Sequence, residues 1–336
     1  MRVRYPISLL TLVVVLTTSA QRHVEVGLST GITHYYGDLG NWDSQVQWNS
    51  MRPAVNLTFR DFFNNPKRYV TRSITMEARL SWFRIGYNEA EPTGGLSGVQ
   101  LHNWRRGLNF RTDLVGASGH LVLNAYREPF TPLFKQRFFM FFYLGAGIYH
   151  GRPKADLFRG EVSADNKYYF WEDGTIRDQP RGTPGAQVVE QDGEYETDLY
   201  SWVTEGRGKG RNTSVVERSS PWHVGIPMGM GIRYMITREL SIGAEFSYYM
   251  FITDMLDNVS ERYATYDEIG GVYADSTQQF LARYISDPTG WGTNGTITGG
   301  TSNRGNPGLP DNFSYFAFEV SYKFKRSPGR RNYMSF

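Results

Sequence analysis

Ten charged residues recur at alternate positions inside apolar stretches of the chain, and the chemistry open to them is ion pairing. Alternate residues of a β-strand point to the same face, so these side chains would share one face of a sheet. Five are acids and five are bases: Glu25, Glu77, Asp113, Glu245 and Glu319 with Arg60, Arg79, Arg111, Arg233 and Lys323. We expect them to pair in a dry interior rather than to line a pore.

Other chemistry finds little support in the sequence. The six histidines never fall at a helical i, i+4 spacing or another metal-ligand spacing, so no metal and no cofactor is predicted. No G-x-S-x-G motif occurs, and "GRGKGRN" at 206–212 lacks the spacing of a phosphate-binding loop. The chain has no cysteine and a net charge of +3, which excludes a disulfide scaffold and argues against nucleic acid as a partner.

The elements that carry the charged residues are long strands. In "VGIPMGMGIRYMITRELSIGAEFSYYM" at 224–250, apolar side chains alternate with glycine or polar residues on both sides of a three-residue break. This is the period of a strand, and the pair reads as one antiparallel hairpin. Each arm exceeds about 10 residues, whereas strands of soluble proteins average about 5 to 6, so the apolar face must meet either lipid or a second sheet.

The same alternation recurs along the chain and predicts eight strands. Short links at 61–72, 124–136 and 237–239 alternate with long ones at 37–50, 84–107, 151–221 and 255–312. Outer-membrane barrels show this asymmetry of short periplasmic turns and long surface loops. The sequence therefore predicts an all-β fold, an eight-stranded antiparallel up-and-down transmembrane barrel with four long surface loops. A β-sandwich is the alternative, but it has no reason to keep its long loops at one end.

The two ends of the sequence have their own patterns. Arg2 and Arg4, an apolar run at 7–16 and small residues before Gln21 predict a signal peptide at 1–20. We expect export to the outer membrane of a Gram-negative cell, with outer-membrane lipids as partners, and a barrel with its loops over 21–326. Residues 327–336 form a basic tail.

Three stretches resemble the PorG-like outer-membrane proteins of Bacteroidota. "IPMGMGIRY" at 226–234 and "FITDMLDNVS" at 251–260 are similar to the last hairpin of that family, and "YYGDL" at 35–39 is similar to its early G-D-L motif. The matching residues are Gly37, Asp38, Leu39, Pro227, Gly229, Gly231, Thr253, Asp254, Leu256 and Asp257.

The resemblance implies a non-enzymatic structural component of the type IX secretion and gliding machinery, associated with a periplasmic ring built of a lipoprotein and its partner protein. Contact with that ring would fall to basic residues of the short turns: Lys67, Arg68, Arg72, Arg127 and Lys135. Two alternatives stay open. One is a surface-binding barrel whose long loops engage ligands or a partner transporter. The other is an outer-membrane enzyme, which would need a matched nucleophile and base near His34, His150 and His223 at the outer rim.

Overall fold

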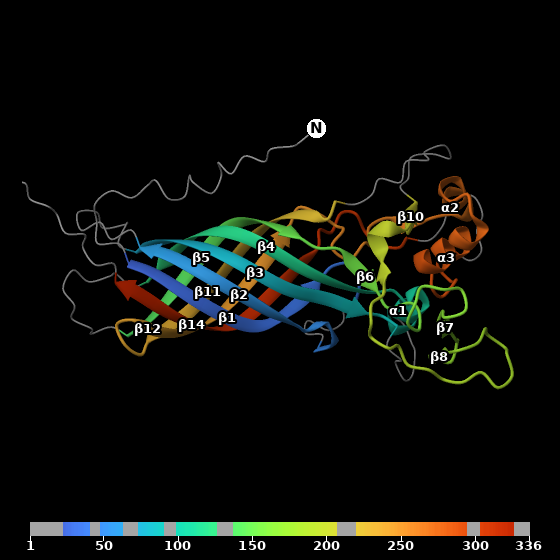
Figure 1. Cartoon of the computed structure of the whole chain (residues 1–336), viewed down its shortest axis with the longest axis horizontal. Helices are drawn as coiled ribbons and strands as arrows, with labels where there is room; N and C mark the ends of the chain where they lie inside the picture. Colours follow the sequence, from blue (N-terminus) through green and yellow to red (C-terminus); the bar gives the residue numbers. More distant parts are fainter. Residues whose placement is uncertain are drawn as a thin grey trace, which may run out of the picture.

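The computed structural model describes residues 23–40, 48–62, 73–90, 99–125, 137–206, 220–293 and 303–325. Its core is a closed antiparallel barrel of eight long strands (Figure 1). The barrel strands are β1 (His23–Tyr36), β2 (Arg52–Phe62), β3 (Ile74–Asn88), β4 (Asn109–Asn124), β5 (Phe138–His150), β11 (Trp222–Met235), β12 (Leu240–Phe251) and β14 (Asn312–Lys325). These are the eight strands that the sequence predicts. The predicted signal peptide and basic tail lie outside the described residues.

Closure of the barrel joins the first strand to the last. β1 pairs with β14 along its whole length, from His23 opposite Lys325 to Tyr36 opposite Asn312. Every other barrel strand pairs with its neighbour in sequence, and β4 pairs with both β3 and β5. All of these pairings are antiparallel. Because each barrel strand pairs with a neighbour on both sides, none has an unpaired edge, as a membrane-spanning sheet requires.

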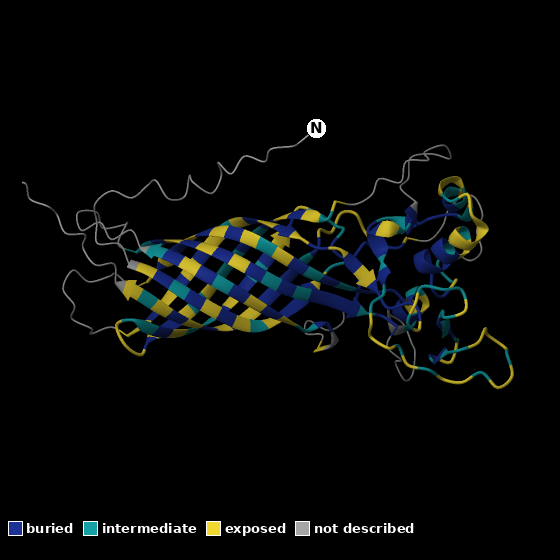
Figure 2. Cartoon of the chain, in the orientation of Figure 1, coloured by how far each residue is buried: buried dark blue, intermediate teal, exposed yellow. Residues whose placement is uncertain are grey.

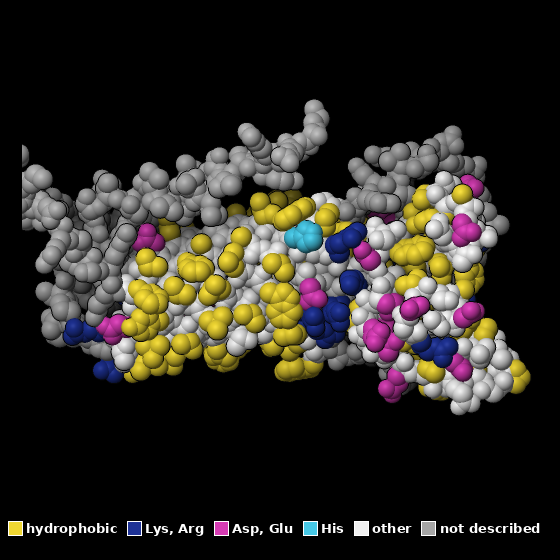
Figure 3. Space-filling view, in the orientation of Figure 1, with side chains coloured by type: hydrophobic (Ala, Val, Ile, Leu, Met, Phe, Trp, Pro, Cys, Tyr) yellow, Lys and Arg dark blue, Asp and Glu magenta, His cyan; other side chains and the backbone are white. Residues whose placement is uncertain are grey.

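Burial alternates along the barrel strands except near their cap ends, which gives the chequered surface of Figure 2. Leu28, Leu80 and Val320 are more than half exposed on the outer face, where lipid would cover them. Figure 3 shows this apolar band along the barrel, with charged side chains concentrated beyond its ends. Exposed aromatic side chains lie towards both ends of the strands, at Trp222 and Tyr36 on one side and at Tyr322 and Phe324 on the other. The chain is therefore an eight-stranded transmembrane barrel.

The glycines that alternate with apolar residues in β11 face the lumen. A Cβ added to Gly229 would lie 2.8 Å from the ring of Tyr143, and one added to Gly231 would lie 2.5 Å from the ring of Phe141. Both rings point into the lumen from β5, so the glycines make room for them. The neighbouring Met230 and Ile232 are exposed on the outer face.

The long loops fold together at one end of the barrel, and we call their described residues in 89–108, 151–206 and 252–311 the outer cap (Figure 1). The described residues of the first loop include the short 3-10 helix η2 (Trp48–Ser50). The cap contains α1 (Val99–Arg106), β6 (Pro153–Ala155), β7 (Tyr169–Phe170), β8 (Ile176–Arg177), β9 (Thr197–Asp198), η4 (Leu199–Ser201), β10 (Glu205–Gly206), β13 (Arg262–Tyr263), α2 (Tyr266–Val272) and α3 (Ser276–Ser286). β6 pairs with β4, and β9 pairs with β6, so the barrel sheet continues into the cap.

Two of the cap helices begin at local sequence signals. Thr265 and Glu268 form a reciprocal capping box at the start of α2, and the Asp275 side chain accepts a hydrogen bond from the Gln278 amide at the start of α3. No helix among the described residues is long and apolar enough to cross a membrane.

The largest difference from a predicted boundary lies at the end of β3. The sequence places a loop at 84–107, but β3 continues to Asn88. Ile85, Gly86 and Tyr87 are all buried, which breaks the alternation used to find the strand. They are buried on both faces because the cap covers the end of the strand.

Candidate functional site: a filled lumen and the contacts at its mouth

The half of the lumen nearer the short turns holds a continuous network of buried ion pairs. Arg60 Nη1 lies 2.8 Å from Glu25 Oε1, and Arg60 Nε lies 2.5 Å from Glu77 Oε2. The Arg60 guanidinium also donates two hydrogen bonds to the carboxylate of Glu319. Arg60 thus forms ion pairs with three carboxylates, which come from three different strands.

Glu77 links this group to a second arginine. Its Oε1 lies 2.5 Å from Arg79 Nε, and Arg79 donates two further hydrogen bonds to Glu245, of 2.6 and 2.8 Å. Arg233 completes the set, with its Nε 3.6 Å from Glu319 Oε1 and its guanidinium 4.1 Å from the centre of the Phe141 ring. Such pairing is what makes buried charges tolerable, because each one alone would carry a large desolvation penalty.

The predicted membership of this network is wrong at two positions. Arg111 and Asp113 lie on the outward parity of β4, where Asp113 pairs with Arg84 at 2.7 Å and the Arg111 guanidinium stacks on the Tyr195 ring at 4.5 Å. These charges can face outward because they lie at the cap end of the strand, beyond the apolar band. The inward parity of β4 instead brings His120 to the network, with Nδ1 3.2 Å from Glu77 Oε1.

The remaining predicted members keep their inward positions. Lys323 is on the inward parity of β14 but is only half-buried, at the end of the barrel near the short turns. The network therefore contains four carboxylates and three guanidiniums, with His120 beside them: Glu25, Glu77, Glu245 and Glu319 with Arg60, Arg79 and Arg233.

The other half of the lumen is filled by aromatic rings. Phe83 is fully buried, with its ring centre 4.8 Å from that of Tyr249 and 5.1 Å from that of Phe313. Tyr249 and Phe313 stack on each other at 4.7 Å, and Tyr149 packs against Phe251 at 5.4 Å. Charge pairs and aromatic rings thus fill successive parts of the same lumen, and the sequence predicted only the former.

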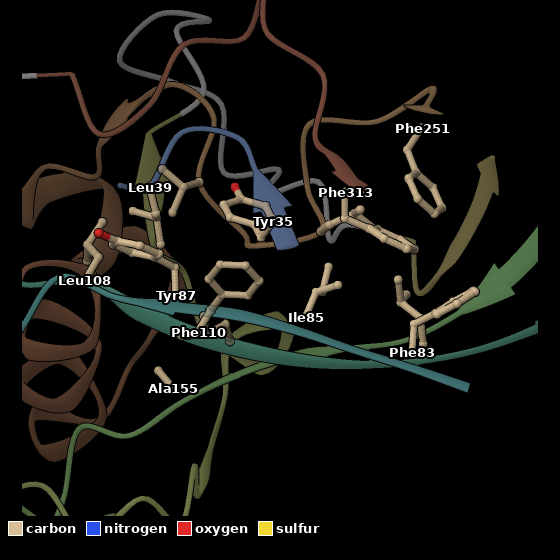
Figure 4. Packing of buried hydrophobic residues seen from close by; sticks show 14 of the residues in the cluster. Tyr35, Leu39, Phe83, Ile85, Tyr87, Leu108, Phe110, Ala155, Phe251 and Phe313 are labelled. Atoms are coloured by element: carbon tan, nitrogen blue, oxygen red, sulfur yellow. The ribbon is translucent and has the colours of Figure 1, made fainter. Parts of the chain in front are cut away.

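The aromatic half of the lumen and the cap share one hydrophobic core. The cluster that contains Phe83 and Phe313 also contains Leu157 and Phe158 after β6, and Leu281 and Ile285 of α3. Figure 4 shows how its side chains run from Phe83 and Ile85 past Phe110 towards Leu39 and Leu108. Because this core crosses the mouth of the barrel, the cap is packed against the barrel rather than tethered to it.

Residues of the family-like motifs meet at this mouth. Tyr35 Oη lies 2.6 Å from Asp257 Oδ2 and 2.8 Å from Asp311 Oδ1. The Leu256 amide donates a 2.8 Å hydrogen bond to the other oxygen of Asp311, and Leu256 itself is fully buried. Gly37 has to lack a side chain, because a Cβ there would lie 1.9 Å from Tyr35 Oη. We call Tyr35, Asp257 and Asp311 the mouth triad.

Other residues of the motifs at 35–39 and 251–260 lie around the mouth triad, whereas Pro227, Gly229 and Gly231 lie in β11 of the barrel wall. Asp38 Oδ2 accepts a 2.9 Å hydrogen bond from the Asn306 amide, and its carbonyl oxygen accepts one of 2.8 Å from Arg106 in α1. The carbonyl oxygen of Thr253 accepts a 3.1 Å hydrogen bond from the Asp311 amide. Leu39 is buried in the shared core. Motifs from the start and the end of the sequence therefore fasten the loops to the barrel.

Carboxyl groups at the mouth have raised pKa values. Burial raises the pKa of Asp254 to about 8 and that of Asp311 to about 7. The pKa of Asp257 is raised well above its usual range, by burial first and then by the nearby charge of Asp311. Burial also raises the pKa of Asp38 to about 6. We therefore expect some of these carboxyl groups to be protonated at neutral pH, where they can donate hydrogen bonds.

The three rim histidines do not converge. His34 has the outward parity of β1 but is buried, with its ring centre 4.6 Å from that of Tyr36; His150 is exposed on the outer face, with its ring centre 4.8 Å from that of Trp222. His223 is buried on the inner side, with Nε2 3.4 Å from the Gly151 carbonyl oxygen. The rings of His150 and His223 therefore lie on opposite sides of the barrel wall.

The cap has an open pocket of about 410 Å³ between the strand pair β7–β8 and the end of α3. Tyr169, Phe170 and Tyr284 line it together with two cations, Lys167 and Arg181. Lys167 Nζ lies 4.8 Å from the centre of the Tyr169 ring, and the Arg181 guanidinium lies 3.7 Å from that of Trp291. Burial lowers the pKa of Lys167. Sequence reasoning missed this pocket because its residues come from distant segments.

Comparison with known proteins finds weak structural similarities. No protein-family model and no curated protein matches the chain. Among solved structures, Neisserial surface protein A is similar at 9% identity and a TM-score of 0.29, over 91% of this chain and 98% of that one. A major outer membrane protein from Thermus thermophilus is similar at 9% identity and a TM-score of 0.35, over 90% of this chain and 99% of that one. The Yersinia pestis outer membrane protein Ail is similar at 12% identity and a TM-score of 0.27, over 89% and 99%. Likenesses this weak leave function to be argued from the chain's own residues.

Proposed function

We propose that this chain is a non-enzymatic outer-membrane barrel that anchors the type IX secretion and gliding machinery through a periplasmic ring, formed by a lipoprotein and its partner protein. The observation that carries the proposal is the double filling of the lumen. Ion pairs occupy one half and packed aromatic rings the other, so the barrel offers no open path. A filled barrel works through the surfaces at its two ends.

The motif residues support a structural role for the barrel. In the family-like motifs, Asp257 accepts a hydrogen bond from Tyr35 of β1, and the Leu256 amide donates one to Asp311 just before β14, so both residues hold a loop to the barrel. Both residues are fully buried, which favours a role in holding a rigid structure over a role in a site that a substrate enters. The resemblance to the PorG-like proteins supplies the identity of the machinery.

The proposed ring contact lies at the end with the short turns. Lys67, Arg68 and Arg72 fall between β2 and β3, and Arg127 and Lys135 fall between β4 and β5; all five lie outside the described residues. A row of basic side chains would favour an acidic partner by electrostatic complementarity. This part of the proposal comes from the sequence alone.

A matched pair of charge reversals tests the proposal. The first variant carries Lys67→Glu, Arg68→Glu and Lys135→Glu, and the control reverses three exposed cap cations, Arg105, Lys154 and Arg159. We expect the first variant to lose secretion and to co-purify less of the ring lipoprotein, while the control keeps both. Heat-modifiable mobility on gels shows that each barrel is folded. If the cap variant loses secretion and the first variant does not, the anchoring proposal fails.

A second candidate function is ligand capture by the cap, favoured by the aromatic pocket with its two cations. Aromatic rings beside Lys and Arg suit an anionic ligand with a flat or apolar face. Lys167→Ala with Arg181→Ala would remove the cations. If this variant abolishes surface binding or cargo attachment while the ring still co-purifies, the cap pocket carries the function instead.

A further inference from the structure

Three acidic side chains of the cap lie close enough together to share one cation. One carboxylate oxygen from each of Asp156, Asp192 and Glu196 lies within 4.8 Å of the other two. Oxygens on opposite sides of a calcium ion are separated by about 4.8 Å, because each Ca–O distance is about 2.4 Å. The three acids come from two segments, one that follows β6 and one that leads into β9.

Each acid is held in place by backbone amides of the facing segment. Asp156 Oδ2 accepts a 2.7 Å hydrogen bond from the Gly193 amide. Glu196 Oε1 accepts hydrogen bonds of 3.0 Å from the amides of Leu157 and Phe158. Asp192 Oδ2 accepts one of 3.0 Å from the Gly160 amide. These contacts fix the three carboxylates without any contribution from a bound ion.

The second oxygen of two of these acids has no partner. Asp156 is only 3% exposed, yet its Oδ1 makes no hydrogen bond, and Glu196 Oε2 is likewise buried and unpartnered. The charges that act most strongly on Asp156 are those of other acids, Asp192, Glu196 and Glu194. A buried carboxylate oxygen without a donor is costly, and a metal ion is the partner that several such oxygens can share.

We propose that Asp156, Asp192 and Glu196 bind a calcium ion in the outer cap. Calcium is favoured over magnesium because it accepts irregular sets of carboxylate and carbonyl oxygens, whereas magnesium demands near-octahedral geometry. Asp192 is exposed, so the ion has a route from solvent. The bound ion joins the two ends of the segment 156–196 at the point where that segment leaves the barrel sheet. The histidine spacings that predict no metal site do not bear on a site made only of carboxylates.

The test compares the full-length barrel, stripped of metal with EDTA in nanodiscs of zwitterionic lipid, before and after addition of CaCl₂ or MgCl₂. We expect calcium to bind with an affinity of about 10⁻⁴ to 10⁻³ M, as extracellular calcium modules do. At 10 mM, it should raise the melting temperature of the cap by roughly 3 to 10 °C. Binding by magnesium that equals binding by calcium overturns the assignment, as does no response to either ion.

Two variants and a control locate the ion. Asp156→Asn and Glu196→Gln keep one oxygen for the backbone amides, and each should lower calcium affinity at least about tenfold. Glu161→Gln removes the same charge from an exposed position nearby and should bind calcium as the parent chain does. In EDTA, Asp156→Asn should melt no lower than the parent, because it removes an unpaired buried charge. An Asp156→Asn variant that retains the full calcium response sinks the proposal, and so does loss of that response in Glu161→Gln.

Discussion

Tyr35 donates a 2.6 Å hydrogen bond to Asp257, a residue 222 positions later in the chain. The same hydroxyl oxygen lies 2.8 Å from Asp311 Oδ1. A hydroxyl group has one proton to donate, so it can serve only one of the two carboxyl groups at a time. The other contact is a hydrogen bond only if that carboxyl group carries a proton itself. The mouth triad therefore needs one protonated acid.

We expect the cap to become less stable as the pH rises. The pKa of Asp311 is raised to about 7 in the folded chain, above its usual value near 4, so the folded state binds the proton more tightly than the unfolded state. The stabilisation is fully present below about pH 4 and is lost as the pH rises to about 7, with a size on the order of 4 kcal/mol. Asp254, with a pKa of about 8, extends the loss to higher pH. Melting curves followed by cap tryptophan fluorescence at pH 5.5, 7 and 8.5 measure it.

Asp311→Asn should weaken that pH dependence. The amide mimics the protonated acid, because its oxygen can accept from the Leu256 amide while its NH₂ group donates to Tyr35. Asp165→Asn, at an exposed cap position, should leave the slope of melting temperature against pH unchanged. Equal slopes for the parent and Asp311→Asn would show that the triad does not share a proton.

A methyl group at Gly37 should loosen the cap. In Gly37→Ala, the new Cβ would lie 1.9 Å from Tyr35 Oη and 2.2 Å from Asp311 Oδ1, so the mouth triad has to separate. We expect a loss of about 1 to 3 kcal/mol in cap stability. Gly271→Ala is the matched control, since its Cβ meets nothing within 4 Å in helix α2 and should be neutral or stabilising. Thermal melts that rank the two variants the other way would contradict the role given to Gly37.

Substitution of an arginine should cost more stability in the lumen than at the rim. Arg60→Met leaves Glu25, Glu77 and Glu319 without their main cation and should cost about 3 to 5 kcal/mol. Arg84→Met removes a pair that is about one-third exposed and should cost less than about 1 kcal/mol. Urea titrations scored by the gel mobility of the folded barrel give both values. Comparable losses in the two variants would mean that the buried network contributes no more than a surface pair.

The barrel should conduct almost no ions. Both halves of its lumen are filled, and the cap core covers one mouth. In planar bilayers, we expect no steady conductance from a single barrel, and none after Lys167→Ala, which changes the cap pocket only. Large ohmic steps in the parent chain would rule out a sealed lumen and, with it, the anchoring proposal.

The barrel strands could be predicted because their pattern of apolar and polar residues is set by neighbouring positions in the sequence. A period of two in β11 and β12 is visible in neighbouring residues, and lipid on the outside keeps that pattern regular. The pattern fails in β4, where Gly116 and Gly119 interrupt it and where Arg111 and Asp113 face outward near the cap. His120 was therefore missed. Strand parity alone does not say where the apolar band ends along a strand.

The cap and its sites were out of reach for a different reason. Asp156 and Glu196 meet only because the segment between them folds back on itself, and no spacing rule covers such a return. The contact of Tyr35 with Asp257 spans most of the chain in the same way. The motifs at 35–39 and 251–260 could be singled out from the sequence, but their meeting at the mouth follows only from barrel closure.

The core shared by lumen and cap also sets an order of events during biogenesis. Phe83, Phe313 and Tyr149 come from three strands that do not pair with one another and meet across the lumen, and the barrel closes only when β14, the last strand in the sequence, pairs with β1. Loop entropy makes such distant pairings slow to form. The cap segments can therefore pack on their complete hydrophobic core only after β1 and β14 have met. Resistance of the cap to protease would consequently report that insertion of the barrel is complete.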